Sequence, residues 1–269
     1  MIAISDIVQL RKDAPSGTIM INRPDRSNAL SREIVSAIHS ALEDFLLEGS
    51  VRAVILTGTG SNFCSGTDLH QLKETAEGKN AMETWHEDAI KMVGLIEYML
   101  HYPKPLLAAV NGQVIGTGAA LMLACDIVVA ATSAGLCMPE ALRGLSPALT
   151  APLLSFRIGT GATSNILLAG NPCDAEEAKR LGLFHELTGD DFVWARCNEL
   201  AAQLALGARE SHQSTKQMLN QTVGEGLITR LKVGAASMAA ARTTPAALEG
   251  INAFLEKRDP DWNSLHVVD

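Results

Sequence analysis

The fold of this chain is decided by residues 105–140, whose centre reads Asn111-Gly112-Gln113-Val114-Ile115-Gly116-Thr117-Gly118. The apolar run 106–110 before this centre predicts a strand, and the small apolar residues 119–124 after it predict a closely packed helix. A strand that passes through glycines into a helix leaves free backbone N–H groups at the helix start, and such groups bind negative charge. The stretch therefore predicts a strand–loop–helix unit with an anion-binding loop.

A carboxylate, Glu140, ends the same stretch beside Pro139. A glutamate after a proline is often only a residue of a helix's first turn, so this position alone favours a structural role. Next to an anion-binding loop it has a second interpretation, in which Thr117 supplies an oxyanion-binding N–H and Glu140 supplies an acid or base. Apolar surroundings would raise the Glu140 pKa and make its carboxylate a stronger base.

Length and composition indicate a globular chain of 269 residues, long enough for one large domain or for a core domain with an appendage. The five cysteines form no C-x-x-C pair, which favours reduced, buried thiols in a cytoplasmic protein over disulfides or a zinc site. No signal-type segment begins the chain, and no apolar run approaches the roughly 18 residues that span a membrane. The net charge of -8 argues against nonspecific nucleic-acid binding. We therefore expect a cytoplasmic protein with no nucleic-acid or membrane partner, in which a local basic patch holds any anionic ligand.

Strands, loops and helices alternate along the first part of the chain, and helices alone follow. Strands are predicted at 2–10, 17–22, 51–56, 106–110, 126–131 and 136–138, and helices from an N-cap at Ser31 to Phe45 and at 80–101, 119–124, 160–169 and 174–182. From about residue 191 the pattern is helical only, including an N-cap and first-turn proline at Thr244-Pro245. We therefore predict an α/β core at 1–190 and a C-terminal helical region at 191–269.

Several common functional motifs are absent. The pair Gly116-x-Gly118 could begin a dinucleotide fingerprint, but Leu121 stands where the third glycine belongs, so NAD binding is disfavoured. No Gly-Lys-Ser/Thr follows, which excludes a P-loop, and no Gly-x-Ser-x-Gly elbow supports a serine hydrolase. The histidines show no zinc-type spacing. We expect neither a metal nor a resident cofactor.

Seven motifs occur in a fixed order along nearly the whole chain. They are Asn22-Arg-Pro-Asp-Arg-Ser-Asn-Ala-Leu30, Phe63-Cys-Ser-Gly-Thr-Asp-Leu69, Ala109-Val-Asn-Gly-Gln-Val-Ile-Gly-Thr-Gly118, Cys125-Asp-Ile127, Pro139-Glu140, Ala178-Lys-Arg-Leu-Gly-Leu183 and Phe254-Leu-Glu-Lys257. Together they resemble the enoyl-CoA hydratase/isomerase (crotonase) superfamily. The resemblance implies a spiral of repeated ββα turns followed by a helical trimerisation region. It also implies homotrimers, often paired into hexamers, and an acyl-CoA thioester substrate, so that coenzyme A enters with the substrate rather than as a cofactor.

The resemblance also assigns roles by position. It puts the two oxyanion N–H groups on Thr67 and Thr117 and the catalytic glutamate on Glu140. Asp68 has a structural alternative, since a residue in its place is suited to cap the helix that follows. The residues implied to line coenzyme A, of which the last two are expected from a neighbouring subunit, are Asp25, Arg26, Ser27, Ser65, Asp68, Leu69, His70, Phe254 and Lys257.

Three departures from the family pattern bear on the reaction. Hydratases carry a second glutamate where this chain has Ala120, and residues 146–151 replace their glycine-rich segment. Thr117 stands in place of a glycine, so we expect helical or extended dihedrals there if its N–H is used. One carboxylate suffices to move a proton from C2 to C4 of a 3-enoyl thioester, whereas hydration suits two. We therefore expect an isomerase with Glu140 as its single base; a hydratase using Glu140 alone, another reaction of the family and a non-catalytic acyl-CoA-binding protein remain alternatives.

Overall fold

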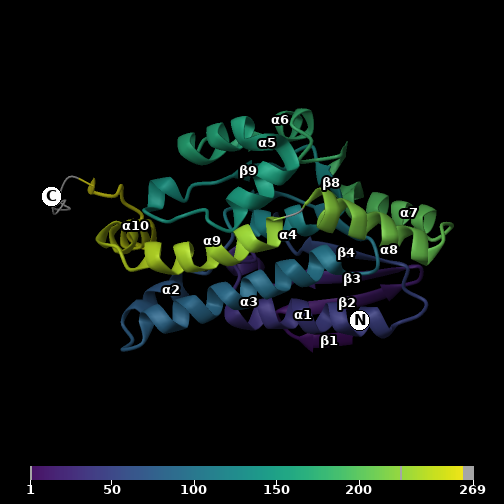
Figure 1. Ribbon diagram of the computed structural model, residues 1–269, viewed down its shortest axis with the longest axis horizontal. Coiled ribbons are helices and arrows are strands. Elements are labelled where there is room, and N and C mark those ends of the chain that lie inside the picture. Colours follow the sequence, from purple (N-terminus) through teal and green to yellow (C-terminus); the bar gives the residue numbers. More distant parts are fainter. Residues whose placement is uncertain (1, 225, 263–269) are drawn as a thin grey trace.

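The computed structural model describes residues 2–224 and 226–262, whose strands form two sheets (Figure 1). Within these residues the larger sheet has seven strands, in the order β1 (Ile2–Ser5), β2 (Val8–Asp13), β3 (Ser16–Ile21), β4 (Ala53–Gly58), β6 (Leu106–Val110), β8 (Ile127–Ala131) and β11 (Glu186–Thr188). The smaller sheet has the order β10 (Cys173–Asp174), β9 (Gly135–Cys137), β7 (Gln113–Ile115) and β5 (Asn62–Cys64). From β3 onward the larger sheet is parallel.

The helices follow the strands as the spiral prediction requires. They are α1 (Arg32–Leu47), α2 (Leu69–Ala76), α3 (Ala81–His101), α4 (Gly118–Ala124), α5 (Thr150–Ala169), α6 (Ala175–Arg180), α7 (Val193–Leu204), α8 (Arg209–Gln217), α9 (Leu227–Arg242) and α10 (Pro245–Glu256). Short helical turns lie at η1 (Pro24–Arg26), η2 (Ala141–Arg143), η3 (Asp190–Phe192) and η4 (Met218–Val223).

The repeated unit is a strand of the larger sheet, a strand of the smaller sheet and then a helix. β4, β6 and β8 lie side by side in the larger sheet, and each leads into β5, β7 or β9, which lie in the same order in the smaller sheet. Every residue of β4 and β6 is buried, as expected for parallel strands covered on both faces. This arrangement confirms the predicted α/β spiral of ββα turns.

Local sequence signals placed several elements correctly. The Ser31 hydroxyl caps α1 by accepting from the Ile34 N–H at 3.4 Å, and the predicted apolar stripe of α1 is buried. The capping carboxylate of Asp174 accepts from the Glu177 N–H at 2.8 Å, and the Thr244 hydroxyl caps α10 through the Ala247 N–H at 3.1 Å. Capping predicts helix starts well because it depends on residues only three positions apart.

The short strands β5, β7, β10 and β11 were not predicted, and two predicted elements differ clearly in their bounds. The strand predicted at 2–10 is divided by a turn at residues 6–7 into β1 and β2, which pair with each other. The helix predicted at 160–169 begins at Thr150 and is kinked at Gly159, whose φ of 76° is not helical. The missed first half contains Pro152, which a helix accepts in its first turn because the N–H it lacks has no partner there.

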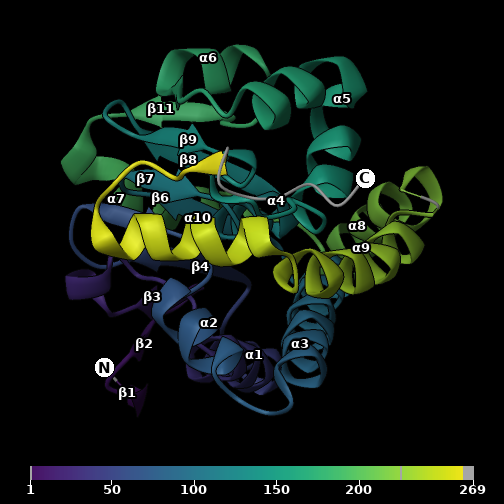
Figure 2. The ribbon, with the colours of Figure 1, turned by 90° about the vertical axis from the view of Figure 1, so that its left-hand side faces the viewer.

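The helices of the predicted C-terminal region pack against different parts of the molecule. α7 packs on β4, β6 and β8 of the larger sheet, whereas α9 lies alongside α3, as Figure 1 shows. α10 lies across one face of the molecule, where it contacts α2 and η2 (Figure 2). The boundary near residue 190 stays a prediction, and residues 225 and 263–269 of the region lie outside the described part.

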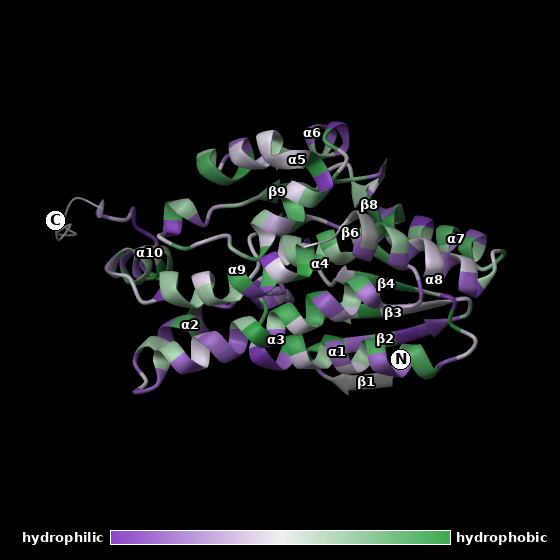
Figure 3. Cartoon of the chain, viewed as in Figure 1, coloured by the Kyte–Doolittle hydropathy of each residue, from purple (hydrophilic) through white to green (hydrophobic). Residues whose placement is uncertain are grey.

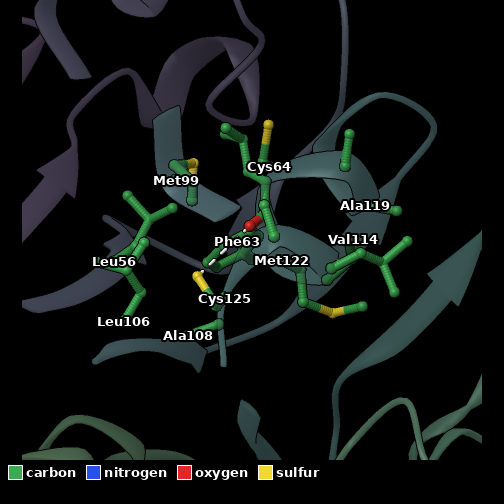
Figure 4. Packing of buried hydrophobic residues seen from close by; sticks show 14 of the residues in the cluster. Leu56, Phe63, Cys64, Met99, Leu106, Ala108, Val114, Ala119, Met122 and Cys125 are labelled. Atoms are coloured by element: carbon green, nitrogen blue, oxygen red, sulfur yellow. Dashed lines mark hydrogen bonds between the residues drawn. The ribbon is translucent and has the colours of Figure 1, made fainter. Parts of the chain in front are cut away.

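Apolar residues concentrate in the inner strands, and outer helices such as α6 and α8 are polar (Figure 3). Behind the loop of residues 116–117, Ala119 and Met122 of α4 pack among Phe63, Cys64 and Val114 of the smaller sheet (Figure 4). In the part of the chain that the structure describes, no helix has the length and apolar character to cross a membrane.

Candidate active site

Three strand ends of the smaller sheet form the candidate site. β5, β7 and β9 are parallel neighbours, so their carboxyl ends meet at one edge of the sheet. The loop after β5 carries Thr67, the loop after β7 carries Thr117, and the segment after β9 carries Glu140. All three line one cavity of about 30 Å³, so the structure brings the three predicted catalytic residues together.

Two glycines allow these segments to approach closely. Gly66 has a φ of 84°, and a Cβ atom there would lie 3.0 Å from the Thr117 nitrogen. Gly116 has a φ of 53°, and its Cβ would lie 3.0 Å from Oε1 of Glu140. Both positions therefore combine a left-handed backbone, which disfavours any side chain, with a close contact at the place of the missing Cβ.

The amide groups of Thr67 and Thr117 are available to a ligand. Thr117 has φ −60° and ψ −19°, which confirms the helical dihedrals expected of a β-branched residue at this position. The hydrogen bonds to Leu30 are made by the residues on either side of Thr67 and not by Thr67 itself. The Leu30 N–H donates to the Gly66 carbonyl, and the Asp68 N–H donates to the Leu30 carbonyl. Neither threonine N–H has a hydrogen-bond acceptor among the described residues. Two free backbone donors at one cavity can stabilise an oxyanion.

The threonine side chains also meet, with their Oγ1 atoms hydrogen-bonded at 2.9 Å. Thr67 and Thr117 line a second cavity of about 50 Å³ on the side of α1, α3 and α9. They are the residues that the two cavities share. The hydroxyl pair thus stands on the boundary between the two cavities.

Glu140 is the acidic group of the first cavity. Its side chain is only 9% exposed, and its Oε2 atom is buried without a hydrogen-bond partner among the described residues. Burial raises the Glu140 pKa to about 7, although the nearby Arg143 opposes the rise. A carboxylate that titrates near neutral pH can both accept and return a proton. Ala120 is buried in α4 and lines neither cavity.

Arg143 is a site residue that sequence reasoning missed. Its side chain lines the Glu140 cavity, and its guanidinium carbon lies 4.2 Å from the ring centroid of Phe254. Burial lowers the Arg143 pKa, while Glu140 opposes that shift. The only signal in the sequence was its position one short helical turn after Glu140, where the Arg143 N–H donates to the Glu140 carbonyl at 3.0 Å.

The residues implied to bind coenzyme A lie partly together. Asp25 and Arg26 are exposed, and the adjoining Ser27 carbonyl accepts from the Ser65 N–H at 3.0 Å, so these two loops are neighbours. His70 is exposed at the start of α2, and Leu69 is a buried residue of the Glu140 cavity wall.

The Asp68 carboxylate is engaged within the protein. It accepts from the N–H groups of His70 and Gln71 at 2.9 and 3.3 Å, and it pairs with Arg23 at 2.5 Å. This confirms the interpretation of Asp68 as a helix cap.

Phe254 lies beside the site of its own chain. The resemblance implied a neighbouring subunit as the source of Phe254 and Lys257, but α10 packs on η2 of the same chain and puts Phe254 against Arg143. Lys257 is exposed just beyond the end of α10.

Among the described residues, no group of three or more histidine, cysteine, aspartate or glutamate side chains could hold a metal ion.

Comparison with known proteins gives matches over nearly the whole chain. Residues 13–265 match the family model described as Enoyl-CoA hydratase/isomerase. A Thermus thermophilus protein named "Putative enoyl-CoA hydratase" is 36% identical over 242 residues, which cover 90% of this chain and 95% of that protein. The 1,2-epoxyphenylacetyl-CoA isomerase of Escherichia coli is 29% identical over 251 residues, covering 91% and 94%. The crystal structure of an enoyl-CoA hydratase from Mycobacterium avium has a TM-score of 0.85 at 28% identity, covering 96% of this chain and 100% of that chain.

Proposed function

The chain belongs to the enoyl-CoA hydratase/isomerase family, and we propose that it shifts the double bond of an enoyl-CoA thioester from the 3- to the 2-position, with Glu140 as its single base. The observation that supports this reaction most is the lining of the cavity beside Thr67 and Thr117. Glu140 is its one carboxylate among the described residues, and it is buried with one oxygen unpaired.

In the proposed reaction the two N–H groups stabilise the oxyanion and Glu140 transfers the proton. The N–H groups of Thr67 and Thr117 donate to the thioester oxygen, which becomes negative when C2 loses its proton. The Glu140 carboxylate accepts that proton, and the C–H electron pair forms a C1–C2 double bond while the carbonyl pair moves to oxygen. The carbonyl then re-forms, the C1–C2 pair becomes the C2–C3 double bond, and the former C3–C4 pair takes the proton back from Glu140 at C4. Glu140 ends as it began, and no water is consumed.

Hydration by Glu140 alone is the rival reaction. It has support from relatives named as hydratases, and the family includes both activities. Water addition needs one group to deprotonate water and a proton for C2, which two carboxylates divide between them. Ala120 removes the second carboxylate from its family position, which favours isomerisation.

The substitution Glu140→Gln tests the single-base mechanism. We expect isomerisation of 3-hexenoyl-CoA to fall about 10²- to 10⁴-fold, the usual range for loss of a general base. Glu176→Gln, a matched change at an exposed glutamate, should leave the rate unchanged. The assay separates 2-enoyl-CoA from 3-hydroxyacyl-CoA by mass spectrometry, so that it also measures hydration.

Each outcome decides between the candidates. Full turnover by the Glu140→Gln variant would contradict the single-base mechanism. A wild-type product that is mainly 3-hydroxyacyl-CoA would favour the hydratase. Acyl-CoA binding without turnover of either substrate would favour a binding protein that retains the scaffold.

A further inference from the structure

A buried cation lines the second cavity. Arg242 is the last residue of α9, it is 7% exposed, and it lines the same cavity as Thr67 and Thr117. Its Nη1 atom is fully buried, and none of its guanidinium nitrogens has a hydrogen-bond partner among the described residues. Burial lowers the Arg242 pKa to about 10, which leaves the group charged at neutral pH. A buried charge without hydrogen bonds is costly, so its presence calls for a ligand or another compensating group.

Among the described residues, the neighbouring acids form no ion pair or hydrogen bond with Arg242. Asp88 is the acid that favours its charge, but both Asp88 oxygens are already bonded to Arg32, at 2.7 and 2.8 Å. Asp68, the other acid of the cavity wall, is paired with Arg23. Lys91 also lines the cavity and has no ion pair among the described residues. In the described part of the chain, the cavity therefore presents two positive charges that have no ion pair, one of them buried.

The shape of the cavity limits what this charge can bind. The phosphates of coenzyme A belong at the surface, near exposed residues such as Arg26, whereas Arg242 is buried in the wall of the second cavity. Because Thr67 and Thr117 line both cavities, an acyl chain held at their N–H groups would have to extend past their hydroxyls to enter the second one. Its volume of about 50 Å³ accommodates roughly three to five water-sized groups, which is room for a terminal methylene and carboxylate.

We infer that this chain selects acyl-CoA thioesters whose short acyl group ends in a carboxylate, and that Arg242 binds that carboxylate. The inference rests on the proposed acyl-CoA function. A carboxylate matches the guanidinium in charge and can accept two parallel N–H bonds. Apolar wall residues such as Leu72, Met92 and Met238 would contact the methylene groups that precede it.

Binding of two unreactive thioesters tests the inference without requiring turnover. Adipoyl-CoA and hexanoyl-CoA have six-carbon acyl groups, and they differ in ending with a carboxylate or a methyl group. By isothermal titration calorimetry, we expect adipoyl-CoA to bind about 10- to 100-fold more tightly, as for one charge-assisted pair. Arg242→Met should abolish that preference and leave hexanoyl-CoA binding unchanged or tighter.

Two further variants keep the test decisive. Arg242→Lys retains the charge and should keep part of the preference, whereas Arg230→Met changes an exposed arginine on the same helix and should alter nothing. Arg242→Met should fold, because it removes a buried charge that has no partner. Equal binding of the two thioesters by the wild type, or a preference that survives in Arg242→Met, would overturn the inference.

The two proposals fail separately. If 3-hexenoyl-CoA is isomerised but adipoyl-CoA has no advantage, the inference about Arg242 is wrong and the proposed reaction stands. If adipoyl-CoA binds preferentially but no double bond moves in either 3-hexenoyl-CoA or its carboxylate-ended counterpart, the reaction is wrong and the inference stands.

Discussion

At the residue scale, burial of Glu140 connects the proposed reaction to pH. The base must be ionised, and its pKa of about 7 lies well above the ordinary value of 4.5. We therefore expect kcat/KM for isomerisation to rise with pH through an apparent pKa near 7 and then level off. A pH–rate profile with 3-hexenoyl-CoA measures this, and a profile already flat above about pH 5.5 would contradict it.

The same pKa shift predicts how stability depends on pH. The folded protein keeps the Glu140 proton to a higher pH than the unfolded chain does, so ionisation of Glu140 costs stability as pH rises from about 4.5 to 7. Glu140→Gln removes this cost and should raise the free energy of unfolding at pH 8 by about 1–3 kcal/mol, with little effect at pH 4.5. Urea unfolding at both pH values is the measurement, and an equal effect at the two would exclude this cause.

Gly116 predicts a position that is intolerant of any side chain. Its φ of 53° and the 3.0 Å approach of Glu140 Oε1 mean that Gly116→Ala must strain the loop and displace the carboxylate. We expect a loss of at least about 1 kcal/mol of stability and a 10- to 100-fold fall in kcat/KM. Gly161→Ala, where nothing lies within 4 Å of the new methyl, is the control for thermal unfolding and rate. Unchanged activity in Gly116→Ala would count against this loop geometry.

At the element scale, the packing of α10 holds the turn that carries Glu140. A Cβ at Gly250 would lie 2.1 Å from the Arg143 carbonyl oxygen, so Gly250→Ala must separate the helix from the turn. We expect it to cost about 1–3 kcal/mol and to lower kcat/KM, although alanine is the better helix former. Gly94→Ala in α3 meets nothing within 4 Å and should be neutral or stabilising. Chemical denaturation and turnover of both variants test this; a stabilised, fully active Gly250→Ala would refute it.

Elements were predictable where the information is local. The Ser31 and Asp174 caps and the buried strand at 106–110 depend on residues within a few positions of one another, and the structure confirms them. The missed half of α5 shows the limit of this approach. Its low-polarity sequence lacks a cap at Leu149 and is kinked at Gly159, so no clear helical periodicity marks its start.

At the scale of the whole molecule, the family resemblance predicts an oligomer. Three chains of 28.6 kDa would give a particle of about 86 kDa, and paired trimers would double that mass. Light scattering after size-exclusion chromatography measures the mass directly. We expect one of these two values across a tenfold range of concentration, and a particle of about 29 kDa would contradict the prediction.

The sequence by itself determined the family, through ordered motifs, and the position of several strands and helices, because strand burial and capping depend on neighbouring residues. Through the family resemblance it also marked Thr67, Thr117 and Glu140 as candidate catalytic residues. Only the tertiary structure decided how those residues meet. The carboxyl ends of β5, β7 and β9 lie together because the strands are parallel neighbours, through pairings between distant residues such as Asn62 with Gln113. It also revealed Arg143 beside Phe254 of the same chain and, within the described residues, the unpaired Arg242 in the wall of the second cavity. A lone arginine has no local pattern that tells burial from exposure, so its role becomes visible only when the surrounding elements are packed.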